Sequence, residues 1–236
     1  MTGIRCSCND GANAHASFPR RAFLRTGVAG AVAVAASAFP LPGQAQTTMS
    51  PDAALKALLD GNKRFVEKKM ASFDEDLAIL KQNTVAKQEP FAAVLSCADS
   101  RVPVELVFDQ TIGHLFVARV AGNVATSEII ASLEYGAAVL GNKAILVLGH
   151  GSCGAVKATI EGKAVPGQIS GLYAPIRPAV DAAGNDLEAA IKANAKIQAN
   201  LLATASPLLA GMIKEGKLKV AAGYYALDSG TVSLLG

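Results

Sequence analysis

Short, continuous apolar runs alternate along this chain with longer stretches in which apolar residues recur every three or four positions. Continuous runs are typical of strands buried on both faces, and the longer spacing is typical of amphipathic helices. The runs predict strands at 91–96, 114–120, 143–148 and 218–227, then a turn at 228–231 into a short final strand. The spacing predicts helices from residue 50 onward and at 74–84, 127–140, 187–204 and 208–214. This alternation predicts an α/β domain with a central, mostly parallel β-sheet flanked by helices.

Cap and proline positions refine two parts of this pattern. Ser50, Pro51 and Asp52 have the features of a helix start: a capping hydroxyl, a proline in the first turn and an acid near the positive end of the helix dipole. The stretch 164–184 is rich in proline and glycine, so we expect a loop over or beside the sheet.

The first 45 residues differ in character from the rest of the chain. The segment from Pro19 to Arg25 resembles the twin-arginine export signal of bacteria, and an apolar run of low charge follows it. We therefore expect a cleaved signal peptide at 1–45, a mature domain at 46–236 and a periplasmic location. The alternative is an uncut membrane anchor, but the run of about 15 residues is shorter than the roughly 20 that a spanning helix needs.

The charge balance changes once this segment is set aside. Four of the 22 lysines and arginines and one of the 19 aspartates and glutamates lie in residues 1–45, so 18 of each remain. A near-neutral mature domain gives no support for binding to nucleic acid or to an anionic membrane, and no later segment is apolar enough to span one. About 190 residues are enough for one compact domain with a sizeable core.

Two short segments carry the candidate chemistry: Cys-Ala-Asp-Ser-Arg at 97–101 and His-Gly-Ser-Cys-Gly at 150–154. Both directly follow predicted strands, and open α/β sheets build their sites at the carboxyl ends of their strands. Together the segments offer Cys97, His150 and Cys153 to a metal ion. Two cysteines and one histidine are the protein ligands of a catalytic zinc site, which leaves a fourth position for water or substrate.

The residues beside these ligands allow more than one role. Asp99 could accept a hydrogen bond from zinc-bound hydroxide, or it could bind the metal and close the site. Arg101 could pair with Asp99, keep it ionised and hold it away from the zinc, although a plain loop salt bridge is the alternative. Cys97 and Cys153 are the only cysteines outside residues 1–45, so in an oxidising compartment they could instead form a disulfide. Their flanking residues favour the metal site.

These motifs resemble those of the β-class carbonic anhydrases. Residues 97–103, Cys-Ala-Asp-Ser-Arg-Val-Pro, resemble the first zinc motif of that family, and residues 150–154 resemble the second. The remaining similar stretches lie at 61–66, 115–123, 131–135, 206–208 and 223–228. The resemblance therefore covers about residues 50–235, and cysteines embedded in such motifs are poor candidates for a disulfide.

The resemblance implies a zinc-dependent lyase, a carbonate dehydratase. Such an enzyme hydrates carbon dioxide reversibly to bicarbonate and a proton, by attack of zinc-bound hydroxide on CO2. It also implies one Zn2+ per subunit, held by Cys97, His150 and Cys153, with Asp99 as a further ligand in a closed form.

The resemblance further implies roles for neighbouring residues and for a second subunit. Asp99 and Arg101 would orient the hydroxide, and Gln110 and Gly154 would contact the substrate, Gln110 from across a dimer interface. The family implies a homodimer in which the N-terminal helices pack on the partner subunit, with further assembly into tetramers.

Two alternatives to CO2 hydration stay open at this point. A relative of the same family could hydrolyse CS2 or COS, because such a zinc site can be redirected to those substrates. A non-catalytic zinc-binding or redox protein is the alternative from a different class. Some members of the family also have a regulatory bicarbonate site that uses a tryptophan and an arginine; this chain has Arg119 but no tryptophan, which argues against that site.

Overall fold

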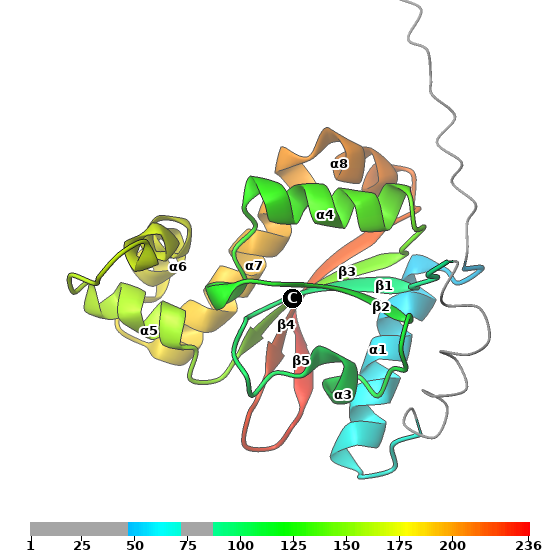
Figure 1. The fold of residues 1–236 in the computed structure, drawn as a ribbon, viewed down its shortest axis with the longest axis horizontal. Coiled ribbons are helices and arrows are strands. Elements are labelled where there is room, and N and C mark those ends of the chain that lie inside the picture. Colours follow the sequence, from blue (N-terminus) through cyan, green and yellow to red (C-terminus); the bar gives the residue numbers. More distant parts are fainter. Residues whose placement is uncertain (1–46, 72–86) are drawn as a thin grey trace, which may run out of the picture. The chain divides into compact units, whose positions relative to one another are not determined.

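The structure is a computed structural model that describes residues 47–71 and 87–236, and the centre of this part is a five-stranded β-sheet (Figure 1). The strands are β1 (Ala92–Ser96), β2 (Leu115–Arg119), β3 (Ala144–His150), β4 (Lys219–Tyr225) and β5 (Val232–Leu235). Their order is β2-β1-β3-β4-β5; the first four are parallel, and β5 pairs antiparallel with β4. The predicted mostly parallel sheet is confirmed, and β1 and β3, which precede the two motifs, are neighbours.

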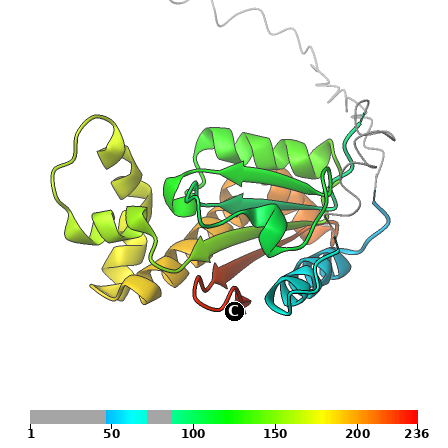
Figure 2. The same ribbon diagram turned by 60° about the horizontal axis from the view of Figure 1, so that its bottom comes forward.

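Helices cover both faces of this sheet (Figures 1 and 2). They are α1 (Pro51–Val66), α3 (Val104–Val107), α4 (Ser127–Ala138), α5 (Gly154–Glu161), α6 (Tyr173–Ala183), α7 (Leu187–Ala205) and α8 (Pro207–Lys214), with 3-10 turns η3 (Ala121–Asn123) and η4 (Ile169–Leu172). Residues of α1 and α3 pack on one face, and residues of α4, α7 and α8 pack on the other. This arrangement confirms the predicted helical flanks.

The continuous apolar runs have a direct explanation in this layering. In β1, Ala92 and Val94 belong to the core beneath α1, whereas Ala93 and Leu95 belong to the core on the opposite face. All residues of β1 and β3 are buried. A strand buried on both faces has no solvent-exposed position that would favour a polar residue, so β1 is apolar up to Ser96 and β3 up to His150.

The first helix begins where its sequence predicts. The Ser50 hydroxyl accepts a hydrogen bond from the backbone N–H of Ala53 at 3.1 Å, and Pro51 is the first helical residue. Further along α1, the buried Asn62 donates to the carbonyl oxygens of Val107 and Gly230, at 3.0 and 2.8 Å. These bonds hold α1 against α3 and against the turn between β4 and β5 of its own chain. Packing of α1 on a partner subunit stays a prediction, and the helix expected at 74–84 lies outside the described residues.

The prediction of a loop over 164–184 is wrong for its second half, which forms α6. Pro175 lies in the first turn, where a missing backbone N–H costs little. Pro178 lies inside the helix and removes one hydrogen bond. The apolar residues Ile176, Ala179 and Val180 recur at helical spacing and are buried. Their burial against α5 and α7 offsets the cost of Pro178.

Within residues 47–71 and 87–236, no helix combines the length and the apolar character that crossing a membrane requires. The predicted signal peptide at 1–45 lies outside the described residues. Its cleavage and export stay predictions.

Candidate metal centre

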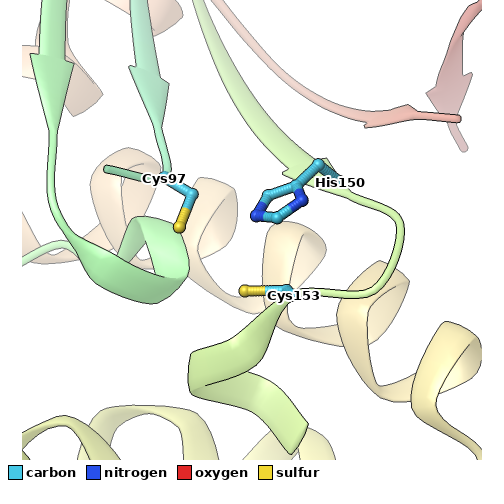
Figure 3. A group of neighbouring side chains, drawn as sticks. All are labelled: Cys97, His150 and Cys153. Carbon is cyan, nitrogen blue, oxygen red and sulfur yellow. The ribbon is translucent and has the colours of Figure 1, made fainter. Parts of the chain in front are cut away.

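The three predicted metal ligands come together at the carboxyl end of the sheet (Figure 3). Cys97 directly follows β1, His150 ends β3, and Cys153 comes just before α5. β1 and β3 pair in parallel, so both strands deliver the residues that follow them to the same edge. The ligand atoms of the three side chains lie within 4.8 Å of one another, and all three side chains are buried.

Close packing shapes the turn between His150 and Cys153. Ser152 has a φ of +55°, a left-handed conformation that residues other than glycine rarely adopt. A β-carbon at Gly149 would lie 3.1 Å from Cγ2 of Ile191 in α7, and one at Gly151 would lie 3.2 Å from the Tyr224 hydroxyl. The two glycines therefore allow α7 and β4 to approach this turn closely, and the turn brings Cys153 back toward His150.

The ring of His150 is oriented as a metal ligand requires. Its Nδ1 lies 2.9 Å from the carbonyl oxygen of Gly151, so Nδ1 carries the proton and donates it. Nε2 then has a free lone pair; it is buried and has no hydrogen-bond partner. Leaving a buried polar atom unpaired is costly, and coordination to a metal removes that cost. The two sulfurs and this nitrogen form the donor set of a zinc site with an open position, so the residues present fit a zinc ion.

The two thiols shift each other's pKa in opposite directions. The hydrogen bond from Cys153 is the main cause that lowers the pKa of Cys97, and the backbone N–H of Gly122, whose nitrogen lies 3.3 Å from Sγ, lowers it further. The same interaction with Cys97, together with burial, raises the pKa of Cys153. Both cysteines are free, so the structure does not contain the disulfide that was the alternative. A lowered pKa favours the thiolate form of Cys97, which is the form that binds metals.

Asp99 and Arg101 form a two-point ion pair beside the ligands. Nε of Arg101 donates to Oδ1 of Asp99 at 2.9 Å, and Nη2 donates to Oδ2 at 2.7 Å. These hydrogen bonds hold the pKa of the Asp99 carboxyl well below its usual range. Oδ2 of Asp99 also lies 3.9 Å from Nε2 of His150. The carboxylate therefore stays charged and borders the metal ligands.

Arg119, at the end of β2, is a residue whose part in this site the sequence analysis missed. Its Nε donates to the carbonyl oxygen of Cys97 at 3.0 Å, and its Nη2 donates to that of Asp99 at 2.6 Å. The guanidinium thus fixes the backbone of the first motif. One feature of the sequence could have indicated this role: Arg119 ends its strand. In the parallel pair of β1 and β2 it lies opposite Ser96, the residue before Cys97.

Two further residues were expected to contact the substrate, Gln110 and Gly154. Nε2 of Gln110 donates to the carbonyl oxygen of Phe108 at 3.0 Å, within its own loop. Gly154 is exposed at the start of α5, with open space where a β-carbon would lie. The substrate contacts expected of both residues stay predictions. His114 is exposed and packs edge-on against Phe91.

A mostly parallel sheet flanked by helices, with a buried Cys-His-Cys cluster at its carboxyl edge, defines an α/β protein with a candidate metal site. The model of the family described as "Carbonic anhydrase" matches residues 92–232, and this chain belongs to that family. A solved structure titled as that of the β-carbonic anhydrase CcaA is 27% identical, with a TM-score of 0.61 over 77% of this chain and 95% of that one. The resemblance to the β-class is therefore confirmed for both family and fold.

Bacterial relatives are similar over parts of their length. The "Carbonic anhydrase" of Mycolicibacterium smegmatis is 42% identical over 135 residues, which cover 56% of this chain and 65% of the relative. The "Carbonic anhydrase 2" of Mycobacterium tuberculosis is 44% identical over 111 residues, which cover 47% of this chain and 53% of the relative. The matched parts thus span less than two thirds of both relatives.

Proposed function

We propose that this chain is a zinc carbonic anhydrase that catalyses the reversible hydration of CO2 to bicarbonate and a proton. The observation that carries the proposal is the cluster of Cys97, His150 and Cys153, buried and with ligand atoms within 4.8 Å of one another. The buried and unpartnered Nε2 of His150 supports a metal in this position. The names of the relatives support CO2 as the substrate.

We propose roles for Asp99 and Arg101 that rest on the resemblance to the family and are supported by the ion pair between them. When bound, the zinc ion supplies the Lewis acidity that makes hydroxide available near neutral pH. Arg101 keeps Asp99 charged and holds it in place. Oδ2 of Asp99 would accept a hydrogen bond from a hydroxide held beside Cys97, His150 and Cys153, and would orient that hydroxide toward the carbon of CO2. Attack of that hydroxide on CO2 would give bicarbonate, and the proton that water loses on forming hydroxide would leave to solvent.

The test compares two histidines of the same chain. Wild type, His150→Ala and His114→Ala are incubated with zinc, their zinc content is measured, and CO2 hydration is followed by stopped flow. We expect wild type and His114→Ala to hold one zinc per chain and to hydrate CO2 rapidly, because His114 is exposed and away from the ligands. His150→Ala should lose zinc and hydration together.

Two outcomes would contradict the proposal in different ways. Full hydration by His150→Ala would show that the ligand assignment is wrong. A zinc-loaded wild type that hydrates no CO2 between pH 6.5 and 9, roughly the range in which hydroxide at such a site forms, would show that the substrate is wrong.

We also propose that residues 1–45 are a twin-arginine signal peptide, removed during export to the periplasm. The proposal rests on the resemblance of the segment from Pro19 to Arg25 to such signals. Replacing Arg20 and Arg21 by lysine should leave the full-length protein in the cytoplasm, whereas wild type should appear shortened in the periplasmic fraction. Equal export of both would contradict the proposal.

We further propose that the mature chain forms a homodimer that can assemble into a tetramer. This proposal rests on the resemblance to the family, in which N-terminal helices pack on the neighbouring subunit. Light scattering coupled to size exclusion should give a mass of two or four chains at micromolar concentration. A single-chain mass under these conditions would contradict it.

A further inference from the structure

The sulfur of Cys97 receives a hydrogen bond from a tightly constrained loop. Gly122, in η3, lies with its backbone nitrogen 3.3 Å from this sulfur. Its φ is +76°, and a β-carbon there would lie 2.7 Å from Cδ1 of Ile176, so the position requires glycine. The carbonyl oxygen of the same residue accepts a hydrogen bond from Nδ2 of Asn194 at 2.8 Å. Gly122 is therefore held on one side by Asn194 and donates to the sulfur on the other.

Asn194 is itself held by a second amide, one turn further along α7. Nε2 of Gln198 donates to Oδ1 of Asn194 at 3.2 Å and to the carbonyl oxygen of Pro175 at 3.0 Å. Oε1 of Gln198 accepts from the backbone N–H of Ala125 at 2.9 Å. Because Oδ1 of Asn194 accepts from Gln198, its Nδ2 must face Gly122. Both side chains are about 1% exposed, so water does not compete for these bonds.

The same helix also contacts the second ligand segment. Gly149, which precedes His150, lies against Ile191 and Ala195 of α7. Asn194 lies between these two contacts along the helix. The helix therefore supports both halves of the cluster, the His150 side through close packing and the Cys97 side through a chain of amide hydrogen bonds.

We propose that Asn194 is a positioning residue of the metal centre, with Gln198 fixing its orientation. Asn194 aims the N–H of Gly122 at the Cys97 sulfur, and this hydrogen bond withdraws charge from the thiolate. A thiolate that receives the bond donates less charge to a metal, and outer partners of this kind commonly tune metal sites. The proposal rests on the proposed zinc site, because it concerns the electronic character of one of its ligands.

A purely structural role is the competing explanation, and it predicts a different result. Two buried amides could simply tie α7 to the loop that contains Ala125 and Gly122. Their loss would then lower the free energy of unfolding and leave the sulfur–metal bond unchanged in the folded protein. A spectroscopic signal from that bond separates the two roles.

The experiment uses cobalt(II) as a coloured substitute for zinc in the full chain. Absorption by charge transfer from sulfur to cobalt reports the charge on the thiolates. In Asn194→Ala we expect this band to shift in energy, and we expect zinc affinity, measured against a chelator, to fall about 10- to 100-fold. Asn200→Ala is the matched control, because Asn200 is exposed on the same helix; its spectrum and affinity should equal those of wild type.

A second variant covers the case in which Asn194→Ala does not fold. Asn194→Asp keeps the size of the side chain and the acceptor for Gln198, but places an oxygen against the Gly122 carbonyl, so the same band shift is expected.

In wild type loaded with cadmium-113, NMR should detect a coupling between the metal and the Gly122 amide proton through the Cys97 sulfur.

The outcomes separate this inference from the proposed function. No thiolate–cobalt band in wild type would contradict the metal site itself. A normal wild-type band that is unchanged in both folded Asn194 variants would overturn the positioning role alone. Absence of the cadmium coupling in a loaded wild type would also overturn it.

Discussion

The two segments that carry the metal ligands are held in place by different means. The Cys97 segment is held by donated hydrogen bonds, from Arg119 to two of its carbonyl oxygens and from Gly122 to its sulfur. The His150 turn is held by contact, with Gly149 against α7 and Gly151 against Tyr224. In the first segment, we expect zinc affinity and the free energy of unfolding to fall in steps as individual donors are removed. In the second, we expect both to fall when a single methyl group is added.

Among the variants of these two segments, the largest effect is expected at Gly149, where α7 packs closely against the strand. In Gly149→Ala, the new β-carbon would lie 3.1 Å from Cγ2 and 3.3 Å from the carbonyl oxygen of Ile191, so α7 or β3 must shift. We expect a loss of about 1–3 kcal/mol in the free energy of unfolding, measured with urea, and weaker zinc binding. Gly211→Ala in α8 is the control, since nothing lies within 4 Å of its β-carbon position. Equal stability of the two variants would contradict the role of packing.

A smaller effect on stability is expected from Arg119→Met. The substitution removes both hydrogen bonds to the Cys97 segment while keeping much of the apolar length of the side chain. We expect the free energy of unfolding to fall by about 1–2 kcal/mol and zinc affinity to fall about tenfold. Arg119→Lys should recover only part of the zinc affinity, because one ammonium group cannot replace both hydrogen bonds of the guanidinium. Wild-type zinc affinity in Arg119→Met would show that the segment does not depend on this donor.

The smallest effect is expected from Gly151→Ala. Its closest neighbour is the hydroxyl at the end of the Tyr224 side chain, 3.2 Å from the new β-carbon, and that end can move. We expect a loss of less than about 1 kcal/mol, and Tyr224→Phe in the same chain should recover part of it. If Gly151→Ala proves as damaging as Gly149→Ala, the turn is constrained by its backbone rather than by its neighbours.

The ligand set could be predicted from the sequence because it depends on local patterns. The apolar runs that end at Ser96 and near His150 place both motifs at the carboxyl end of buried strands. The motifs then meet because β1 and β3 are parallel neighbours, an adjacency that the structure supplies. His150 and Cys153 are three residues apart, so a single turn is enough to bring both side chains to one ion.

The supporting residues could not be predicted in the same way. Asn194 and Gln198 are polar residues on a helix, which ordinarily face solvent, and only the packing of α7 on the sheet shows that they are buried. The role of Arg119 likewise depends on which strand lies beside β1. Helix α6 was missed because Pro175 and Pro178 argue locally against a helix, while the burial that stabilises it is tertiary.

The distance along the chain between Cys97 and His150 links metal binding to the resistance of the protein to proteolysis. About 50 residues separate the two, and in an unfolded chain bringing them together would cost considerable chain entropy. In the folded chain the sheet already holds these residues together. An ion that binds only the folded form therefore stabilises it by about 4 kcal/mol when the free ion is at a thousand times its Kd. The concentration of free zinc would then determine how often β1 and β3 separate. It would therefore also determine how fast proteases degrade the chain.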